Sequence, residues 1–80
     1  MNIKILGTGC SACRSMYNTV AQIVAREGMN AEVEYVQDIE RILSYGVMST
    51  PALVIDEQVV MLGFRGASKI ERALHEWSAV

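Results

Sequence analysis

The sequence is poor in the features that mark several large classes of protein. Seven Lys and Arg stand against nine Asp and Glu, which leaves a net charge of −2 with the single histidine neutral. A chain without clustered basic residues is not expected to bind nucleic acid as its main partner, because phosphate contacts need grouped Lys and Arg. No segment approaches the roughly 18 consecutive apolar residues of a membrane-spanning helix, so no membrane span is expected.

Cysteine is also scarce. With only Cys10 and Cys13, the chain cannot form the disulfide scaffold of a small secreted domain. A bond between these two residues would close a loop too short to restrict the unfolded chain much. The apolar run over 3–6 is too short for the core of a signal peptide, which favours a cytoplasmic protein, where disulfides are usually transient and catalytic. The cysteine pair is therefore interpreted as chemical and not structural.

What the sequence does contain is enough apolar surface for one small domain over 1–80, since 51% of its residues are hydrophobic. The apolar run 3–6 predicts a strand buried on both faces. Helical spacing follows from residue 10 or 11 to residue 27, with Gly28 placed to end the helix. Over 31–36, Glu alternates with Val and Tyr, which predicts a half-exposed strand at a sheet edge.

The second half of the chain predicts a short helix, a hairpin and a final helix. Asp38 can cap the short helix, whose apolar residues are Ile39, Ile42 and Leu43. The apolar runs 52–55 and 59–62 predict a hairpin, although residues 56–58 lack a typical turn pair and leave the turn type open.

Ser68 and Glu71 match a capping box at the start of the final helix. The resulting order, βαβαββα, predicts an α/β fold. Its four-stranded mixed sheet would carry helices on both faces.

The segment Cys10-Ser11-Ala12-Cys13 lies between the first predicted strand and the first predicted helix. Free N–H groups and the helix dipole favour a thiolate at Cys10, at the helix N-terminus. Cys13 is one turn further on the same side and is expected to be the less exposed of the two. We therefore expect Cys10 to attack a substrate disulfide and Cys13 to resolve the mixed disulfide.

Other uses of the cysteine pair stay open at this point. Two thiolates are half of a zinc site, but a second Cys or His pair is lacking, so a closed zinc site is not expected. Two soft thiolates are enough for copper(I), which makes a copper carrier the alternative function. Small metal carriers also place C-x-x-C after a first strand, although their element order is βαββαβ. A regulatory module that senses redox state is a third interpretation.

A later motif makes the pattern more specific. Thr50 and Pro51 precede an apolar strand within the segment 46–55, and the segment 3–13 carries the cysteine pair. On these residues the chain resembles the small thioredoxin-like proteins of archaea and bacteria, also described as glutaredoxin-like thioredoxins or redox-active disulfide proteins. The resemblance covers essentially all 80 residues. It implies a thioredoxin-like fold in which the Thr50–Pro51 bond is cis and lies against the cysteine pair.

The resemblance also implies an activity and its partners. The activity is dithiol–disulfide exchange with disulfide-containing protein substrates, and a flavoprotein thioredoxin reductase supplies the electrons. The redox-active disulfide itself does the chemistry, with no bound cofactor, and the protein is expected to be a monomer. The residues expected to contact substrate are Thr50, Pro51, Ser11 and Ala12. Thr50 would present backbone groups to an extended substrate segment.

Some residues depart from the family pattern. Ser11 stands where a proline is usual, and Gly9 replaces the tryptophan that usually precedes the first cysteine. No acid is placed to lie beneath Cys13, and Lys4, the one charged residue of the first strand, is expected to face solvent. The Gly-Gly-x-Asp segment with which glutaredoxins hold glutathione is also missing.

Three further residues have less specific interpretations. Met48 either lines an apolar docking patch or packs at its rim. Tyr17, one turn after Cys13, is interpreted as half-buried helix surface beside the site. His75 lies off the apolar stripe of the final helix and is given no role.

Overall fold

The structure is a computed structural model that describes residues 1–78. Its elements are β1 (Asn2–Leu6), α1 (Ser11–Glu27), β2 (Glu32–Val36), α2 (Ile39–Ser44), β3 (Ala52–Ile55), β4 (Gln58–Leu62) and α3 (Ala67–Ser78). This is the βαβαββα order that the sequence predicts, and it differs from the βαββαβ order of small metal carriers. Over the same residues, no helix combines the length and the apolar content that a membrane crossing needs.

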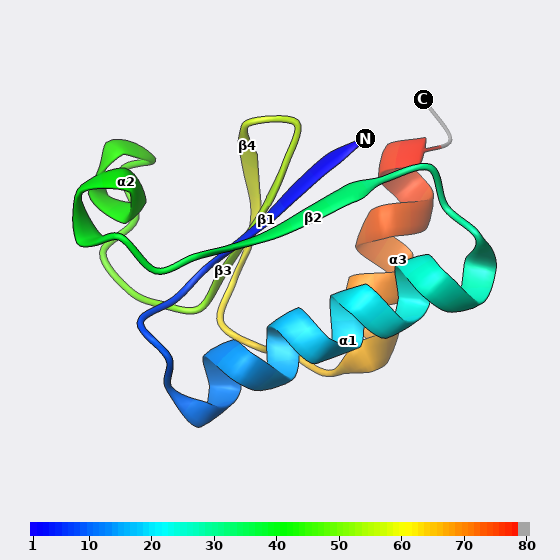
Figure 1. Cartoon of the computed structure of the whole chain (residues 1–80), viewed down its shortest axis with the longest axis horizontal. Coiled ribbons are helices and arrows are strands. Elements are labelled where there is room, and N and C mark those ends of the chain that lie inside the picture. The colour runs from blue at the N-terminus through cyan, green and yellow to red at the C-terminus, as the bar shows by residue number, and fades with distance from the viewer. Residues whose placement is uncertain (79–80) are drawn as a thin grey trace.

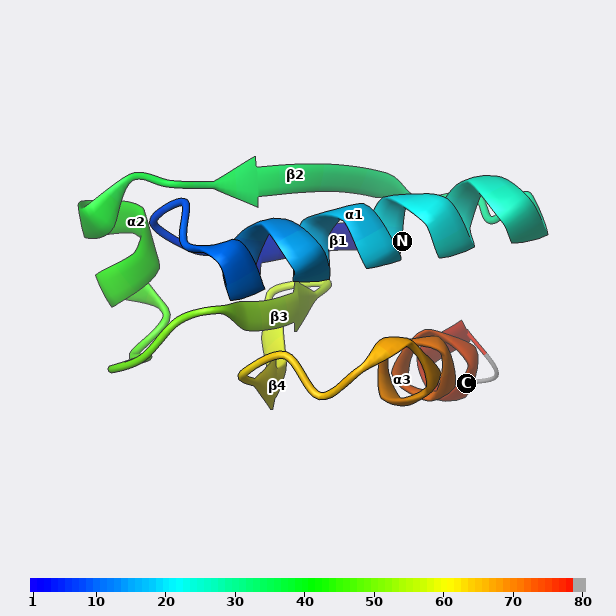
Figure 2. The ribbon, with the colours of Figure 1, turned by 90° about the horizontal axis from the view of Figure 1, so that it is seen from below.

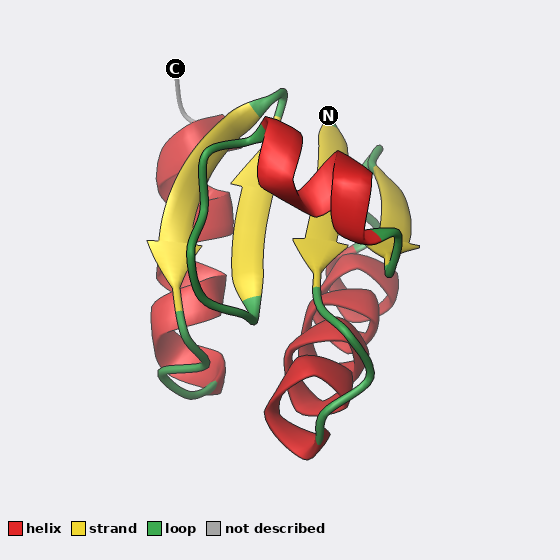
Figure 3. Ribbon diagram, turned by 90° about the vertical axis from the view of Figure 1, so that its left-hand side faces the viewer, coloured by secondary structure: helices red, strands yellow, loops and turns green. Residues whose placement is uncertain are grey.

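The strands form one mixed sheet in the order β2-β1-β3-β4. β1 pairs with β2 in parallel and with β3 antiparallel, and β3 and β4 form the antiparallel hairpin. α1 and α3 cover one face of the sheet, and the short α2 crosses the other face (Figure 1 and Figure 3). In Figure 2, α1 runs along the sheet with α3 beside it. The prediction of helices on both faces is therefore confirmed.

The central strands β1 and β3 are buried on both sides because alternate side chains enter two separate cores. The core under α1 and α3 contains the following fully or almost fully buried residues: Ile3, Ile5, Met16, Val20, Ile23, Leu53, Ile55, Ile70 and Leu74. The core under α2 is smaller and contains Leu6, Val36, Ile42, Val47, Ala52 and Val54. Each fully buried aliphatic side chain stabilises the fold by about 1.5–3 kcal/mol.

The ends of α1 and α2 follow the sequence signals. Gly28 adopts the left-handed conformation at φ 60°, and Met29 N–H bonds back to the Val24 carbonyl at 3.0 Å. This C-terminal turn satisfies carbonyls that the helix leaves free. At the start of α2, the Asp38 carboxylate accepts a bond from Glu40 N–H at 3.1 Å, so Asp38 is the predicted cap.

The predicted capping box of α3 is wrong. The helix begins at Ala67, before Ser68, because the Gly66 carbonyl already accepts a bond from Ile70 N–H at 3.4 Å. Ser68 therefore lies inside the first turn. The Glu71 side chain accepts a bond from Arg26 on α1 at 2.7 Å, where a capping box would direct it back to the Ser68 backbone.

The β3–β4 turn is made of two residues that seldom adopt its conformation. Asp56 and Glu57 have φ of 48° and 69°, the left-handed region that a type I′ hairpin turn requires and that glycine usually fills. Side-chain bonds offset this strain: Asp56 accepts from Asn2 N–H at 2.8 Å and from Trp77 Nε1 at 2.8 Å. Glu57 accepts bonds from Lys4 Nζ and, at 2.9 Å, from the Tyr45 hydroxyl.

The expectation that Lys4 faces solvent is wrong, because Lys4 is buried. Lys4 is only 8% exposed. Because side chains alternate along a strand, Lys4 lies on the same face of the sheet as Leu6, the face that α2 covers. Its ammonium reaches the end of the sheet, where it donates to Asn2 Oδ1 at 2.9 Å and to Glu57. The bond from Lys4, together with that from Tyr45, holds the pKa of the Glu57 carboxyl below its usual value.

A Glu57→Gln substitution tests this ion pair, because it removes the charge and keeps the shape of the side chain. Since folding lowers the pKa of Glu57, the pair stabilises the fold above the usual value of 4.5. That contribution is lost as the pH falls through the lower pKa of the folded state. Urea unfolding should show that the variant is less stable than the wild type at neutral pH and that the two converge in acid.

Glu40→Gln is the matched control, since Glu40 forms no ion pair within residues 1–78. A stability difference for Glu57→Gln that stays constant from neutral pH into acid would contradict this account of Lys4.

Candidate active site

The two cysteines lie where β1 leaves the sheet and α1 begins. They form a disulfide, with their Cα atoms 5.1 Å apart. Cys10 is the N-cap of α1, and Cys13 lies in the first helical turn. Ser11 and Ala12, between them, belong to the same turn, with Ser11 exposed and Ala12 half-buried.

The backbone around Cys10 favours negative charge on its sulfur. Cys10 Sγ accepts a bond from Cys13 N–H at 3.2 Å, and the first turn of α1 holds no acidic side chain. Arg14 brings a guanidinium close by, donating to the Gly9 carbonyl at 2.8 Å. Free N–H groups, the positive end of the helix dipole and a nearby cation all stabilise a thiolate at this position.

The two cysteines differ sharply in exposure. Cys10 is exposed, whereas Cys13 is 0% exposed. The sequence predicted this difference from the position of each residue relative to the helix start, and the structure confirms it. An external thiol or disulfide can therefore reach the sulfur of Cys10 and not that of Cys13.

Gly7 is a residue of the site that the sequence analysis missed. A Cβ atom at this position would stand 2.7 Å from both Cβ and Sγ of Cys13, closer than real Cβ atoms approach. Gly7 is itself buried, and its N–H bonds to the Val36 carbonyl at 3.0 Å, so the backbone cannot easily move away. The missing side chain of Gly7 therefore makes the space in which Cys13 lies.

Thr50 and Pro51 reach the same end of the sheet from β3. The bond between them is cis, as the resemblance implied, and Pro51 is buried. β1 and β3 pair Leu6 with Ala52, so the loop after Leu6 and the segment before Ala52 leave the sheet together. The Pro51 carbonyl accepts a bond from Gly63 N–H at 2.7 Å, which ties this segment to the loop that leads into α3.

A hollow of about 290 Å³ adjoins this end of the sheet. It is lined by Thr8 from the loop before Cys10, by residues of α2, and by the segment that leads to Pro51: Thr8, Ile39, Ile42, Leu43, Val47, Met48, Ser49 and Thr50. Three of its apolar side chains remain exposed, namely Ile39 at 54%, Leu43 at 58% and Met48 at 96%. Of the three apolar residues of α2, only Ile42 is buried.

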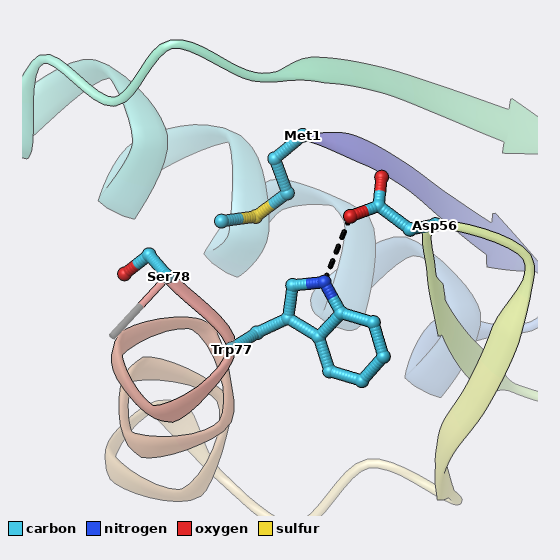
Figure 4. A pocket seen from close by; sticks show the side chains of 4 residues that line it. All are labelled: Met1, Asp56, Trp77 and Ser78. Carbon is cyan, nitrogen blue, oxygen red and sulfur yellow. Dashed lines mark hydrogen bonds between the residues drawn. The ribbon is translucent and has the colours of Figure 1, made fainter. Parts of the chain in front are cut away.

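A second hollow lies at the opposite end of β1, away from the cysteines. It is lined by Met1, Asp56, Trp77 and Ser78, and Figure 4 shows the Trp77 indole N–H pointing to the Asp56 carboxylate. The bond from Asn2 N–H, followed by this bond from Trp77, lowers the pKa of the Asp56 carboxyl. Trp77 packs against the main core, so this region joins α3 to the β3–β4 turn.

One cluster within residues 1–78 has the composition of a metal site but lies apart from the cysteines. Glu27, Glu71 and His75 bring one ligand atom each within 4.8 Å of one another. Arg26 contacts both carboxylates, at 3.2 Å to Glu27 and 2.7 Å to Glu71, and His75 bonds to Glu27. These ion pairs tie α1 to α3, which gives His75 a structural role that the sequence analysis did not assign.

Gly7→Ala tests the close approach at Cys13. The added methyl group overpacks the site, so we expect a loss of about 1–3 kcal/mol in the free energy of unfolding. The displaced Cys13 sulfur should also change the rate at which a small dithiol reduces the disulfide. Gly28→Ala is the control, because Gly28 has a left-handed backbone and open space around its Cα. This substitution should lower the free energy of unfolding by roughly 1–2 kcal/mol without changing the reduction rate. An unchanged reduction rate in Gly7→Ala would contradict the role of Gly7.

Comparison with known proteins identifies the family. The family model described as thioredoxin domain matches residues 1–75. A relative named thioredoxin from Methanothermobacter thermautotrophicus is 35% identical over 71 residues, which cover 89% of this chain and 91% of the relative. Another thioredoxin, from Methanocaldococcus jannaschii, is 36% identical over 61 residues, or 76% of this chain and 70% of the relative. With its Cys10–Cys13 disulfide at the start of α1, this chain belongs to the thioredoxin family, has the thioredoxin-like fold and is a thiol–disulfide oxidoreductase.

Proposed function

We propose that this protein reduces disulfide bonds in other proteins, with Cys10 as the attacking cysteine and Cys13 as the resolving one. The observation that supports these roles most directly is the contrast between an exposed Cys10 at a helix N-terminus and a fully buried Cys13 bonded to it. Only the exposed sulfur can meet a disulfide on a second protein, and its position also favours the thiolate that attacks.

The reaction conserves electrons over two exchanges. The Cys10 thiolate attacks one sulfur of the substrate disulfide, which forms a mixed disulfide and releases the other substrate sulfur as a thiolate. The Cys13 thiolate then attacks Cys10 Sγ, forms the Cys10–Cys13 bond and releases the second substrate thiolate. The substrate gains two electrons, and the protein is left in the disulfide form.

The substrate is proposed to lie across Ser11 and Ala12 on one side and Thr50 and Pro51 on the other. Ser11 and Ala12 follow Cys10 in the first turn of α1, and Thr50 and Pro51 directly precede β3. Thr50 also lines the hollow beside α2, so a substrate chain that contacts its backbone can place an apolar side chain against the exposed Leu43. Burial of that side chain adds binding energy next to the reacting sulfur.

Electrons return to the protein from a dithiol partner, which we propose to be a flavoprotein thioredoxin reductase. The redox-active disulfide carries the electrons, so no bound cofactor takes part. The two relatives named thioredoxin support this assignment of partners. We propose that the chain acts as a single domain over 1–80 and as a monomer, in the cytoplasm, where the reduced dithiol is maintained.

Substitution of each cysteine by serine tests the two roles. Cys10→Ser should abolish reduction of a protein disulfide, because the buried Cys13 cannot reach it. Cys13→Ser should accumulate a mixed disulfide through Cys10, which mass spectrometry detects as the mass of the protein plus that of the substrate. Residual turnover in Cys10→Ser, or a mixed disulfide that does not accumulate in Cys13→Ser, would reverse or remove these assignments.

Leu43→Glu tests the hollow as part of the substrate surface. A carboxylate at this position should raise KM for a protein disulfide by roughly threefold to tenfold, the loss of about one apolar contact. Turnover of a small disulfide reagent, which does not fill the hollow, should stay the same. Val59→Glu is the matched control, because Val59 is 38% exposed at the start of β4, away from the cysteines. Equal effects of the two substitutions would argue against the hollow.

A further inference from the structure

The hydroxyl group of Tyr35 is unusual within residues 1–78. It is the one buried side-chain polar atom in this part of the chain that has no hydrogen-bond partner. A buried hydroxyl without a partner destabilises a fold by about 1–3 kcal/mol, so each such group calls for an explanation. The ring of Tyr35 is well anchored, since it stacks on Tyr17 of α1 with centroids 5.3 Å apart and planes at 17°.

The ring that carries this hydroxyl lies close to the active site, on the side of the buried cysteine. Tyr35 is on β2, paired in register with Ile5, and its ring passes Gly7. The position that a Gly7 Cβ would take is 3.4 Å from Cε1 of Tyr35 and 2.7 Å from Sγ of Cys13. The hydroxyl is attached to the ring carbon next to Cε1. The Tyr35 ring and the Cys13 sulfur therefore border the same space, the one that a Gly7 side chain would fill.

Cys13 needs a partner of this kind once the disulfide opens. Its side chain is 0% exposed, so a thiolate formed there has no direct contact with solvent. An ion without hydrogen bonds in such surroundings is strongly destabilised. Among residues 1–78, the only buried charged residue is Lys4, and it belongs to the opposite face of the sheet, beside Tyr45.

The charged side chains of α1 and α3 that could face this region have partners of their own. Arg14 donates to the Gly9 carbonyl. On α3, which packs against α1, Glu71 and His75 bond to Arg26 and Glu27 at the far end of α1. Of the two stacked tyrosines beside α1, Tyr35 is the one whose hydroxyl is buried without a partner.

We propose that the Tyr35 hydroxyl donates a hydrogen bond to the Cys13 thiolate whenever the Cys10–Cys13 disulfide opens. This inference rests on the proposed function, in which a dithiol recharges the protein. A thiolate of that dithiol attacks Cys10 Sγ, the Cys10–Cys13 bond breaks, and its electron pair stays on Cys13. The second thiol of the reductant then attacks the mixed disulfide, which frees Cys10 and leaves the reductant oxidised. The Tyr35 proton remains on its oxygen and stabilises the charge on Cys13 throughout.

The test is a thiol titration in the Cys10→Ser background, where Cys13 is the only thiol. Adding Tyr35→Phe keeps the stacked ring and removes the hydroxyl. The pKa of Cys13, followed by the ultraviolet absorbance of the thiolate, should rise so that the thiolate fraction at a given pH falls about tenfold. With both cysteines present, Tyr35→Phe should slow reduction of the disulfide by a small dithiol, because the leaving thiolate is less stable.

Tyr17→Phe is the matched control, since it removes a hydroxyl from the other ring of the same stack. A pKa of Cys13 that does not change in Tyr35→Phe would overturn the proposal, and so would equal changes in the two variants. The titration needs no turnover, so its result is separate from that of the serine substitutions. A failure of Cys13→Ser to trap substrate would remove the resolving role and leave the measured hydrogen bond standing.

Discussion

The close approach of the Gly7 backbone to Cys13 is the contact on which the active site depends. With no side chain at Gly7, the Cys13 sulfur occupies buried space at the end of β1, 2.7 Å from where a Cβ would stand. Cys10, three residues earlier, remains at the exposed N-terminus of α1. One short segment thereby holds two sulfurs in different surroundings, one accessible and favourable to charge, the other shielded. We propose that this asymmetry makes Cys10 the attacking cysteine and Cys13 the resolving one.

The sheet supports this arrangement by being covered unequally on its two faces. α1 and α3 close one face over a large aliphatic core, which fixes the start of α1 relative to β1. On the other face α2 is only six residues long, and it buries Ile42 while Ile39 and Leu43 remain exposed. The well-covered face holds the cysteines in position. The partly covered face leaves apolar surface next to Thr50, where we propose that a protein substrate binds.

Local signals in the sequence were enough to predict the element order, the ends of α1 and the difference between the cysteines. Helix caps, helical periodicity and strand alternation each involve residues that are close together in the chain. They can therefore be recognised in a single sequence. One contact that was missed joins residues far apart in the chain. Lys4 meets Glu57 only because β1 and the hairpin are neighbours, and that bond helps to hold a turn without glycine. Gly7 lies only a few residues before Cys13, but no sequence pattern shows that Cys13 folds back against it.

The central claim is that the two sulfurs differ in access and reactivity. Competitive alkylation of the fully reduced protein measures this difference directly. With a limiting amount of iodoacetamide and peptide mass spectrometry, the account predicts that Cys10 is modified first and that Cys13 reacts only after denaturant opens the fold. Equal rates at the two cysteines, or faster modification of Cys13 in the folded protein, would contradict it.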